Sequence, residues 1–481
     1  SSDLLNKLKY RIDLIKNSNK KNGGVYIYSN LIGCDGNRLF FDGSSLICCN
    51  GKFLSQCSQF DISKLEVKSA TINLKSINNY RSNSKSRGVQ ASQIEFFPEI
   101  KVDKYLCNSN NNISNNIELK IYSKMEEMIY GPALWLWDYL RKSGLNGFFL
   151  PLSGGSDSSS TAIIVFSMCK ILFDKFKIIK DDLRRIIQDK DFVPDSPQHI
   201  CSKIFFTCYM STPNNSNLTK QYAKQLAEDI GSNHKHIDIQ NIINSFITLF
   251  QQNFDFKPKF KMNGGSHNQN LSLQNLQART RMVLSYFCSQ LLMETKNKNG
   301  GLLVLGSSNV DEALMGYYTK YDCSSADLNP IGSFSKINLK KFLKFSKDYF
   351  KFDILEKINN QQPTAELEPF NKEYIQSDEK DIGISYKDIS YLGKLRKENN
   401  LGPYHMAEYL INHKYNDYDK DKIKELVKKF FRRYSINRHK MTTLTPSYHA
   451  EDYSPDDNRH DLRPFIYNIN WKLQNELIDN L

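Results

Sequence analysis

The stretch that decides the fold is Pro151-Leu152-Ser153-Gly154-Gly155-Ser156-Asp157-Ser158. Its first two residues end the run FFLPL (148–152), which is typical of a buried strand. At its last residue, about Ser158, begins an apolar segment that extends to Phe173 and has the length of a helix. Two adjacent glycines let a backbone approach a ligand closely, and the amides of such a turn bind anions together with the helix N-terminus. The stretch therefore predicts a phosphate site.

The alternatives for this stretch are a Walker loop, a dinucleotide fingerprint or a plain tight turn. The GxxxxGK[ST] and GxGxxG spacings are both missing, which excludes the first two. An isolated Gly-Gly pair would favour the tight turn. The complete SGGxDS string between a strand and a helix favours nucleotide binding instead.

Further strand-like segments follow, each succeeded by a segment with helical periodicity. They are KIFFTCYM (203–210), HKHIDI (234–239) and GLLVLG (301–306). Strands that alternate with helices predict βαβ units and an α/β fold, a doubly wound parallel sheet with helices on both faces. Ligands in such sheets bind at the carboxyl ends of the strands.

The N-terminal part has a different pattern. Residues 24–75 consist of short strand-like runs separated by turns, including ATINL at 70–74, and predict β-rich structure. Asn-rich sequence follows at 108–116 and predicts a connector. We therefore divide the chain into residues 1–107, a connector at 108–118, and a catalytic domain at 119–481.

Composition agrees with a folded protein of 481 residues, because 40% are hydrophobic and 12% aromatic. The net charge of +13 suits any anionic partner, but Lys and Arg are scattered, which favours a solvated basic surface over a nucleic-acid stripe. The ten Cys form no CxxC pair and no zinc spacing, so free thiols in a reducing compartment are expected. No apolar run is long enough to span a bilayer and no signal peptide is recognisable, so we expect a cytoplasmic location, with the nucleus as the alternative.

The SGGxDS string resembles the loop of the ATP pyrophosphatases (adenine nucleotide α-hydrolase-like proteins). That group includes NAD⁺, asparagine and GMP synthetases and some tRNA-modifying enzymes. The resemblance implies that the loop holds the pyrophosphate end of ATP and that Asp157 holds Mg²⁺, which accepts one or two carboxylates besides phosphate oxygens. An Asp at this position would also suit a helix N-cap.

A second run narrows the resemblance. Residues 306–322, GSSNVDEALMGYYTKYD, and the later Asp327-Leu328-Asn329-Pro330 resemble the signature of NAD⁺ synthetases. The resemblance extends from about residue 119 to 470 through NLQARTRM (275–282), PTAELEP (363–369), RHKMTTLTP (438–446) and YSPDDNRHDLRPF (453–465). The last string is similar to that of the eukaryotic, glutamine-dependent branch.

Position by position, the resemblance implies three sets of site residues. Catalytic roles fall to Ser153, Asp157 and Lys336. ATP is bound by Ser153, Gly154, Gly155, Ser156, Asp157, Ser158, Ser307, Lys336 and Thr364, and Mg²⁺ by Asp157 and Glu312. Deamido-NAD is bound by Asn275, Arg279, Glu312, Lys320, Asp327, His439 and Lys440. Taken singly, Arg279 could be a surface residue of a helix and Glu312 a first-turn residue that complements the helix dipole.

The implied reaction activates the nicotinate carboxylate of deamido-NAD by adenylation and lets ammonia displace AMP. The implied cofactors and partners are ATP, Mg²⁺, deamido-NAD, and ammonia or glutamine. We also expect a homo-oligomer, and neither nucleic acid nor a membrane as partner. The alternatives are a tRNA-modifying ATP pyrophosphatase, which would need a basic appendage or zinc cysteines, and a regulator that has lost activity, which the two retained carboxylates disfavour.

The N-terminal part resembles the end of a nitrilase-like glutaminase domain, an α/β sandwich, through GGVYIYSNLIGCDGNRLFFDGSS (23–45). That domain uses a Cys nucleophile, a Glu base and a Lys in segments before this stretch. None of the ten Cys lies in the expected motif, and Cys34 follows the nucleophile's place. We therefore expect the missing glutaminase portion to lie elsewhere in a full-length chain or in a separate chain.

Overall fold

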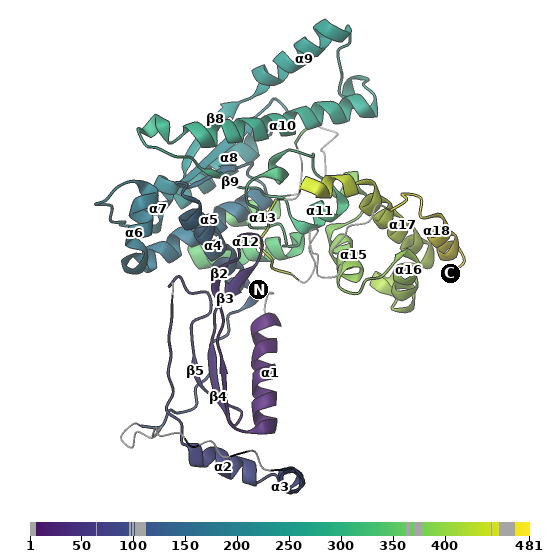
Figure 1. Cartoon of the computed structure of the whole chain (residues 1–481). Coiled ribbons are helices and arrows are strands. Elements are labelled where there is room, and N and C mark those ends of the chain that lie inside the picture. Colours follow the sequence, from purple (N-terminus) through teal and green to yellow (C-terminus); the bar gives the residue numbers. More distant parts are fainter. Residues whose placement is uncertain are drawn as a thin grey trace. The chain divides into compact units, whose positions relative to one another are not determined.

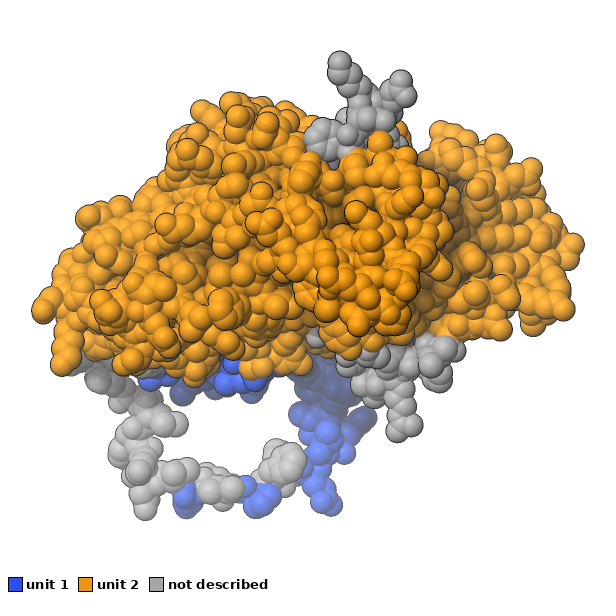
Figure 2. Space-filling model, turned by 90° about the horizontal axis from the view of Figure 1, so that it is seen from above, with its two compact units in different colours: residues 1–35, 40–127 blue, residues 36–39, 128–481 orange. Residues whose placement is uncertain are grey.

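The computed structural model describes residues 6–63, 65–95, 98, 101, 112–361, 366–369, 378–443, 445–451 and 467–481. The chain forms two compact units, shown in two colours in Figure 2. Unit 1 comprises Ser1–Asp35 and Phe40–Glu127, and unit 2 comprises Gly36–Leu39 and Met128–Leu481. The division thus falls at residue 127, beyond the expected connector at 108–118.

The described part of that connector is bonded to unit 1. The amide of Ser114 donates to the carbonyl of Thr71 at 2.9 Å, and that of Ile117 to the carbonyl of Phe53 at 2.9 Å. Residues 108–111 lie outside the described residues. The low hydropathy of the Asn-rich run did not reveal these backbone pairings, because they depend on main-chain groups that every residue carries.

Unit 1 is built around one helix and a small antiparallel sheet. Leu8, Ile12 and Ile15 of α1 pack against Leu46 of β4 and Phe53 of β5. Strands β1, β4 and β5 form a three-stranded sheet in the order β1-β4-β5, and β2 pairs with β3. The elements are α1 (Asn6–Asn22), β1 (Val25–Tyr28), β2 (Ile32–Cys34), β3 (Phe40–Asp42), β4 (Leu46–Cys49), β5 (Lys52–Gln56), α2 (Leu74–Ser82) and α3 (Lys85–Ser92).

The β-rich prediction for unit 1 is confirmed for the region that contains β1 to β5 and wrong for ATINL. Residues 70–73 form no strand, and α2 begins at Leu74. The side chain of Asn73 accepts a hydrogen bond from the amide of Lys75 and caps the helix. A capping Asn therefore outweighs the β-branched residues that precede it.

Unit 2 contains a four-stranded parallel sheet in the order β8-β7-β6-β9. Every predicted strand is present. The elements are α4 (Lys124–Ser143), β6 (Phe148–Pro151), α5 (Ser156–Asp174), α6 (Phe176–Ile187), α7 (Pro197–Ile204), β7 (Phe205–Ser211), α8 (Asn217–Ile230), β8 (Asn233–Asp238), α9 (Gln240–Phe254), η1 (Lys261–Asn263), α10 (His267–Leu291), η2 (Glu294–Lys296) and β9 (Leu303–Val304).

Helices cover both faces of this sheet (Figure 1). Phe149, Phe206 and Met210 pack in one cluster with residues of α9 and α10, including Ile243 and Leu276. On the alternate positions of β7, Tyr209 is buried, and its hydroxyl lies 3.0 Å from the hydroxyl of Thr219 on α8. Because both faces are covered, the central strand β6 is apolar along its whole length and reads FFLP, whereas the edge strand β8 reads NHKHID and is mostly polar. The α/β prediction with helices on both sides is confirmed.

The rest of unit 2 is helical, and α15 to α18 lie together in Figure 1. Their core includes Ile389, Leu410, Val427 and Phe430. The elements are α11 (Val310–Met315), η3 (Cys323–Ser325), α12 (Lys336–Phe350), α13 (Ile354–Asn360), α14 (Asp378–Ile382), α15 (Tyr386–Lys397), α16 (Pro403–Asn412), η4 (Tyr415–Asp417), α17 (Lys420–Ile436), η5 (Arg438–Thr443) and α18 (Lys472–Asp479). Among the residues that the structure describes, no helix has the length and hydropathy to cross a membrane.

The start of β6 depends on a glycine. A Cβ at Gly147 would stand 2.1 Å from the carbonyl oxygen of Ile204, a backbone atom at the end of α7. We expect Gly147→Ala to lower the free energy of unfolding by at least about 2 kcal/mol, because the backbone of β6 or α7 must move. Gly301→Ala is the matched control, since its Cβ would meet its nearest neighbour at 3.4 Å. Urea denaturation that gives equal stabilities for the two variants would contradict this close approach.

Candidate functional site: the loop after strand β6

The predicted phosphate loop connects β6 to α5 at the carboxyl end of the sheet. Gly154 has a φ of +80°, and a Cβ there would stand 2.2 Å from the carbonyl oxygen of Thr219. The hydroxyls of Ser153 and Ser158 lie 2.9 Å apart, and the Gly155 amide donates to the Ser153 hydroxyl at 3.3 Å. These bonds close the turn and leave the first turn of α5 directed at the site, as an anion cradle requires.

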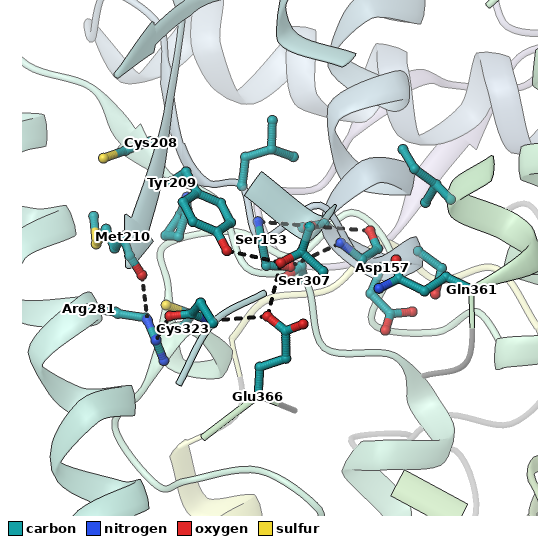
Figure 3. Close-up of a pocket in the computed structure, with 18 of the residues that line it drawn as sticks. Ser153, Asp157, Cys208, Tyr209, Met210, Arg281, Ser307, Cys323, Gln361 and Glu366 are labelled. Carbon is teal, nitrogen blue, oxygen red and sulfur yellow. Dashed lines mark hydrogen bonds between the residues drawn. The ribbon is translucent and has the colours of Figure 1, made fainter. Parts of the chain in front are cut away.

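A pocket opens beside this loop (Figure 3). Its walls come from the carboxyl ends of β6 and β7, the residue Ser307 after β9, and the beginnings of α5 and α12. The predicted residues that line it are Ser153, Gly155, Ser156, Asp157, Ser158, Ser307 and Lys336. The pocket therefore lies where parallel α/β sheets bind ligands.

Lys336, the first residue of α12, brings two of the predicted carboxylates together. Its side chain is 3% exposed, and its ammonium forms an ion pair with Asp157. The same ammonium lies 3.5 Å from Glu312 Oε1. Asn309 supports both carboxylates, because its side-chain amide donates to Asp157 Oδ1 at 3.3 Å and its oxygen accepts from the Glu312 amide at 3.0 Å.

Asp378 adds a third carboxylate beside this pair. The hydroxyl of Tyr386 donates to Asp378 Oδ2 at 3.1 Å and to Glu312 Oε1 at 3.3 Å. Burial, together with the charge of Asp157, raises the pKa of Glu312 well above that of a free glutamate. Burial alone would lower the pKa of Lys336, but the charges of Asp157 and Glu312 raise it above that of a free lysine. The lysine therefore carries its charge, whereas burial favours the neutral form of Glu312.

The donor set of this cluster fits Mg²⁺. Asp157 and Glu312 converge on one cation, the ammonium of Lys336. Mg²⁺ needs only one or two carboxylates and completes its shell with waters and phosphate oxygens. Within the described ranges, no group of three or more His, Cys, Asp and Glu side chains is arranged around one metal position. The two carboxylates would thus hold the ion jointly with a phosphate ligand.

Other predicted residues gather around the loop between α11 and η3. Asn275 and Arg279 lie one turn apart on α10. The Thr319 hydroxyl donates to Asn275 Oδ1 at 2.6 Å, and Arg279 Nε donates to the carbonyl of Lys320 at 3.0 Å. Lys440 approaches from η5, and its ammonium donates to the carbonyls of Gly316 and Tyr318 at 2.6 Å each. Residues that lie far apart in the sequence, Asn275, Arg279 and Lys440, thus form a second group around the loop that contains Lys320.

The remaining predicted residues are placed differently. Asp327 binds the sheet, because its carboxylate accepts hydrogen bonds from the Val304 amide at 2.8 Å and the Tyr286 hydroxyl at 3.0 Å. Glu312, predicted to bind the same substrate as Asn275 and Arg279, lies in the Lys336 cluster. His439 is exposed. Thr364 and the string at 453–465 lie outside the described residues.

The sequence reasoning missed several residues that line the pocket. Arg281 is one, and its guanidinium donates to the Met210 carbonyl at 3.2 Å and to Asn215 Oδ1 at 3.3 Å. Tyr209, Glu366 and Asp378 are others. Arg281 stands two residues after Arg279 in the quoted NLQARTRM string, so attention to the helix period could have separated the pocket-facing arginine from the exposed one.

Comparisons with known proteins identify relatives of this chain. The family described as NAD synthase matches residues 129–443. The glutamine-dependent NAD(+) synthetases of Drosophila melanogaster and Dictyostelium discoideum are each 46% identical over 99% of this chain, which spans 62% and 68% of their lengths. A crystal structure of a glutamine-dependent NAD(+) synthetase from Cytophaga hutchinsonii matches 99% of this chain and 69% of that one, with a TM-score of 0.72 at 23% identity, and so shares the fold.

These alignments correct one expectation. They cover nearly the whole chain, unit 1 included, and unit 1 lies outside the NAD synthase match, which begins at residue 129. The chain therefore shares with glutamine-dependent relatives a part besides the synthase region. This is at odds with the expectation that the glutaminase portion lies elsewhere.

Lys336 should stabilise the folded chain more at high pH than at low pH. We expect Lys336→Met to lose about 3 kcal/mol at pH 8, since it leaves buried carboxylates without their cation. A carboxyl with a raised pKa, such as Glu312, binds more protons when folded, so lowering the pH stabilises the variant. The loss should therefore shrink at pH 5.

The measurement is urea denaturation of wild type and variant at both pH values, without divalent cations. Lys341→Met is the matched control, because Lys341 is exposed on the same helix and should show no loss at either pH. A loss for Lys336→Met that is equal at pH 5 and pH 8 would contradict the buried cluster.

Proposed function

The chain belongs to the family of glutamine-dependent NAD(+) synthetases, and from this premise we propose that unit 2 uses ATP to amidate deamido-NAD to NAD⁺. The observation that carries the proposal is the loop between β6 and α5, which lines one pocket together with Asp157 and Lys336, while Lys336 also pairs with Glu312. A nest of amides opposite a lysine and two carboxylates suits a triphosphate with its metal ion.

The proposed chemistry needs alignment and charge neutralisation more than proton transfer. Hydroxide is a poor leaving group, so the nicotinate carboxylate first attacks the α-phosphorus of ATP. Pyrophosphate leaves, and ammonia then displaces AMP from the acyl adenylate. Ser153 and the loop amides hold the pyrophosphate end, and Lys336 offsets its charge. Bound Mg²⁺, held by Asp157 and Glu312, would supply further charge neutralisation.

The second group of residues suits the dinucleotide. Asn275 and Arg279 on α10 and Lys440 on η5 meet at the loop that contains Lys320. Arginine and lysine side chains there provide charge for the diphosphate of deamido-NAD. Burial lowers the pKa of Lys440, and Asp322 counteracts this effect. His439 and Asp327 remain proposed contacts of the same substrate.

The finer assignments follow from the same premise. The sheet of unit 2 is proposed to be of the ATP pyrophosphatase type, and unit 1 to be part of a nitrilase-like glutaminase domain, with glutamine as the source of ammonia. Exposed apolar side chains on α9 and α10, among them Phe250, Phe254 and Phe287, support a homo-oligomer. We also propose a cytoplasmic location, which the free, mostly buried thiols of the described cysteines support.

The proposal is tested by product analysis. With ATP, Mg²⁺, deamido-NAD and millimolar ammonium, the chain should release AMP, pyrophosphate and NAD⁺ in equal amounts. Asp157→Asn should still fold, with Glu312 left as a partner for Lys336, but lose at least about 100-fold in turnover, as loss of a charge-stabilising group typically does. Release of ADP in place of AMP would contradict adenylation. Near-normal turnover of the variant with unchanged Mg²⁺ dependence would remove Asp157 from the metal site.

Arg279 should affect one substrate selectively. Its side chain is exposed and donates one hydrogen bond to the Lys320 carbonyl, so Arg279→Ala should fold normally. We expect its KM for deamido-NAD to rise about tenfold, with the KM for ATP nearly unchanged, because a charged hydrogen bond is worth about 1.5 to 3 kcal/mol.

Steady-state kinetics with each substrate varied in turn makes this measurement. Gln290→Ala, an exposed change on the same helix, is the control and should change neither KM. Asp327→Ala provides the contrast, since loss of its bonds to Val304 and Tyr286 should also lower the melting temperature. Equal rises in both KM values for Arg279→Ala would exclude a specific role at the dinucleotide.

A further inference from the structure

Residues 366–368 accept a set of hydrogen bonds from the body of unit 2. Glu368 Oε1 accepts from the side-chain amides of Asn270 and Gln274 on α10. The carbonyl of Leu367 accepts from Gln277 Nε2 at 2.8 Å. Glu366 has different partners, because its carboxylate lies in the wall of the pocket and accepts from residues at the start of α8. Leu367 and Glu368 thus bond to α10, and Glu366 bonds to the start of α8.

Glu366 holds the beginning of α8. Its Oε2 accepts hydrogen bonds from the Ser216 amide at 3.3 Å, Asn215 Nδ2 at 3.3 Å and the Thr219 hydroxyl at 3.0 Å. Ser216 is the N-cap residue of this helix. Figure 3 shows Glu366 directed towards the pocket, with Ser307 and Tyr209 on its far side.

The partners of Glu366 are the same groups that shape the phosphate loop. The carbonyl of Thr219 is the atom against which Gly154 packs, where a Cβ would stand at 2.2 Å. The Thr219 hydroxyl also lies 3.0 Å from the hydroxyl of Tyr209, and Asn215 Oδ1 accepts from Arg281 at 3.3 Å. One carboxylate oxygen therefore connects the first turn of α8 to two pocket-lining side chains and, through Thr219, to the loop.

We propose that Glu366 is a positioning residue for the nucleotide site: it fixes the first turn of α8, and so the wall against which the Gly154 turn rests. The inference rests on the proposed function for the identity of the nucleotide. Glu366 Oε2 positions this wall of the pocket because it accepts three hydrogen bonds from the start of α8. An amide oxygen can do the same, and no bond to the other oxygen, Oε1, is found among the described residues. Negative charge itself is not required.

The test compares Glu366→Ala, Glu366→Gln and the control Glu368→Ala in the full 481-residue chain. Binding of Mg²⁺ with α,β-methylene ATP, a non-reacting analogue, is followed by calorimetry, and binding of deamido-NAD is followed separately. We expect Glu366→Ala to bind the analogue about tenfold more weakly, the ratio that loss of a helix cap gives. Its deamido-NAD affinity should stay unchanged. Glu366→Gln and Glu368→Ala should bind the analogue within about twofold of wild type.

Hydrogen exchange provides a readout that needs no nucleotide. The amides of residues 216–223 should exchange faster in Glu366→Ala than in the other two variants, since only that change releases the helix start. Unchanged analogue affinity in Glu366→Ala, or an equal loss in Glu366→Gln, would overturn the inference. Failure of the wild-type chain to bind the analogue would overturn the proposed function instead, while the exchange rates would still decide whether Glu366 holds α8.

Discussion

The site depends on the burial of one lysine ammonium among three carboxyl groups. Lys336 is 3% exposed and pairs with Asp157 and Glu312, with Asp378 close by. A buried charge without a partner costs several kcal/mol, so these side chains must be held together by the whole fold. Asp311 contributes to this, because its fully buried carboxylate accepts from the Lys336 amide at 2.8 Å and from the Ser390 hydroxyl. Residues that hold the backbone of α12 thus hold the charge cluster as well.

The parallel sheet places the pocket beside this charge cluster. Strands β6 and β7 and the segment after β9 end at the same edge, so the Gly154 turn, Tyr209 and Ser307 face one space although they lie far apart in the sequence. Two glycines set how closely the backbones approach there. Gly147 lies against the end of α7, and Gly154 lies against the first turn of α8. The side-chain chemistry of the site therefore rests on contacts between backbone atoms.

The two groups of polar residues around the pocket divide the work that the proposed reaction requires. One side, from α5, α11 and α12, carries the charges suited to phosphates and a metal ion. The other side, from α10 and η5, presents Asn275, Arg279 and Lys440 around a loop. Between them stands the wall that contains Arg281 and Glu366. Arg281 of α10 bonds to Asn215 beside α8, and Gly154 of the phosphate loop packs against the Thr219 carbonyl of α8, so α10 contributes to both sides.

The sequence by itself determined the strands of unit 2, the loop between β6 and α5, and the residue types that its chemistry needs. Hydrophobic periodicity and glycine spacing are local properties, and they can be read along the chain. Only the tertiary structure decided which of those residues meet. Asp327 turned out to bind the end of β9, Arg281 and not Arg279 lines the pocket, and Glu366 and Asp378 joined the site. Their partners lie up to 179 residues away, as for Lys336 and Asp157, and no local pattern encodes a hydrogen bond across that separation. The beginning of α2 shows the same limit at short range, because a single capping Asn, and not β propensity, set the structure there.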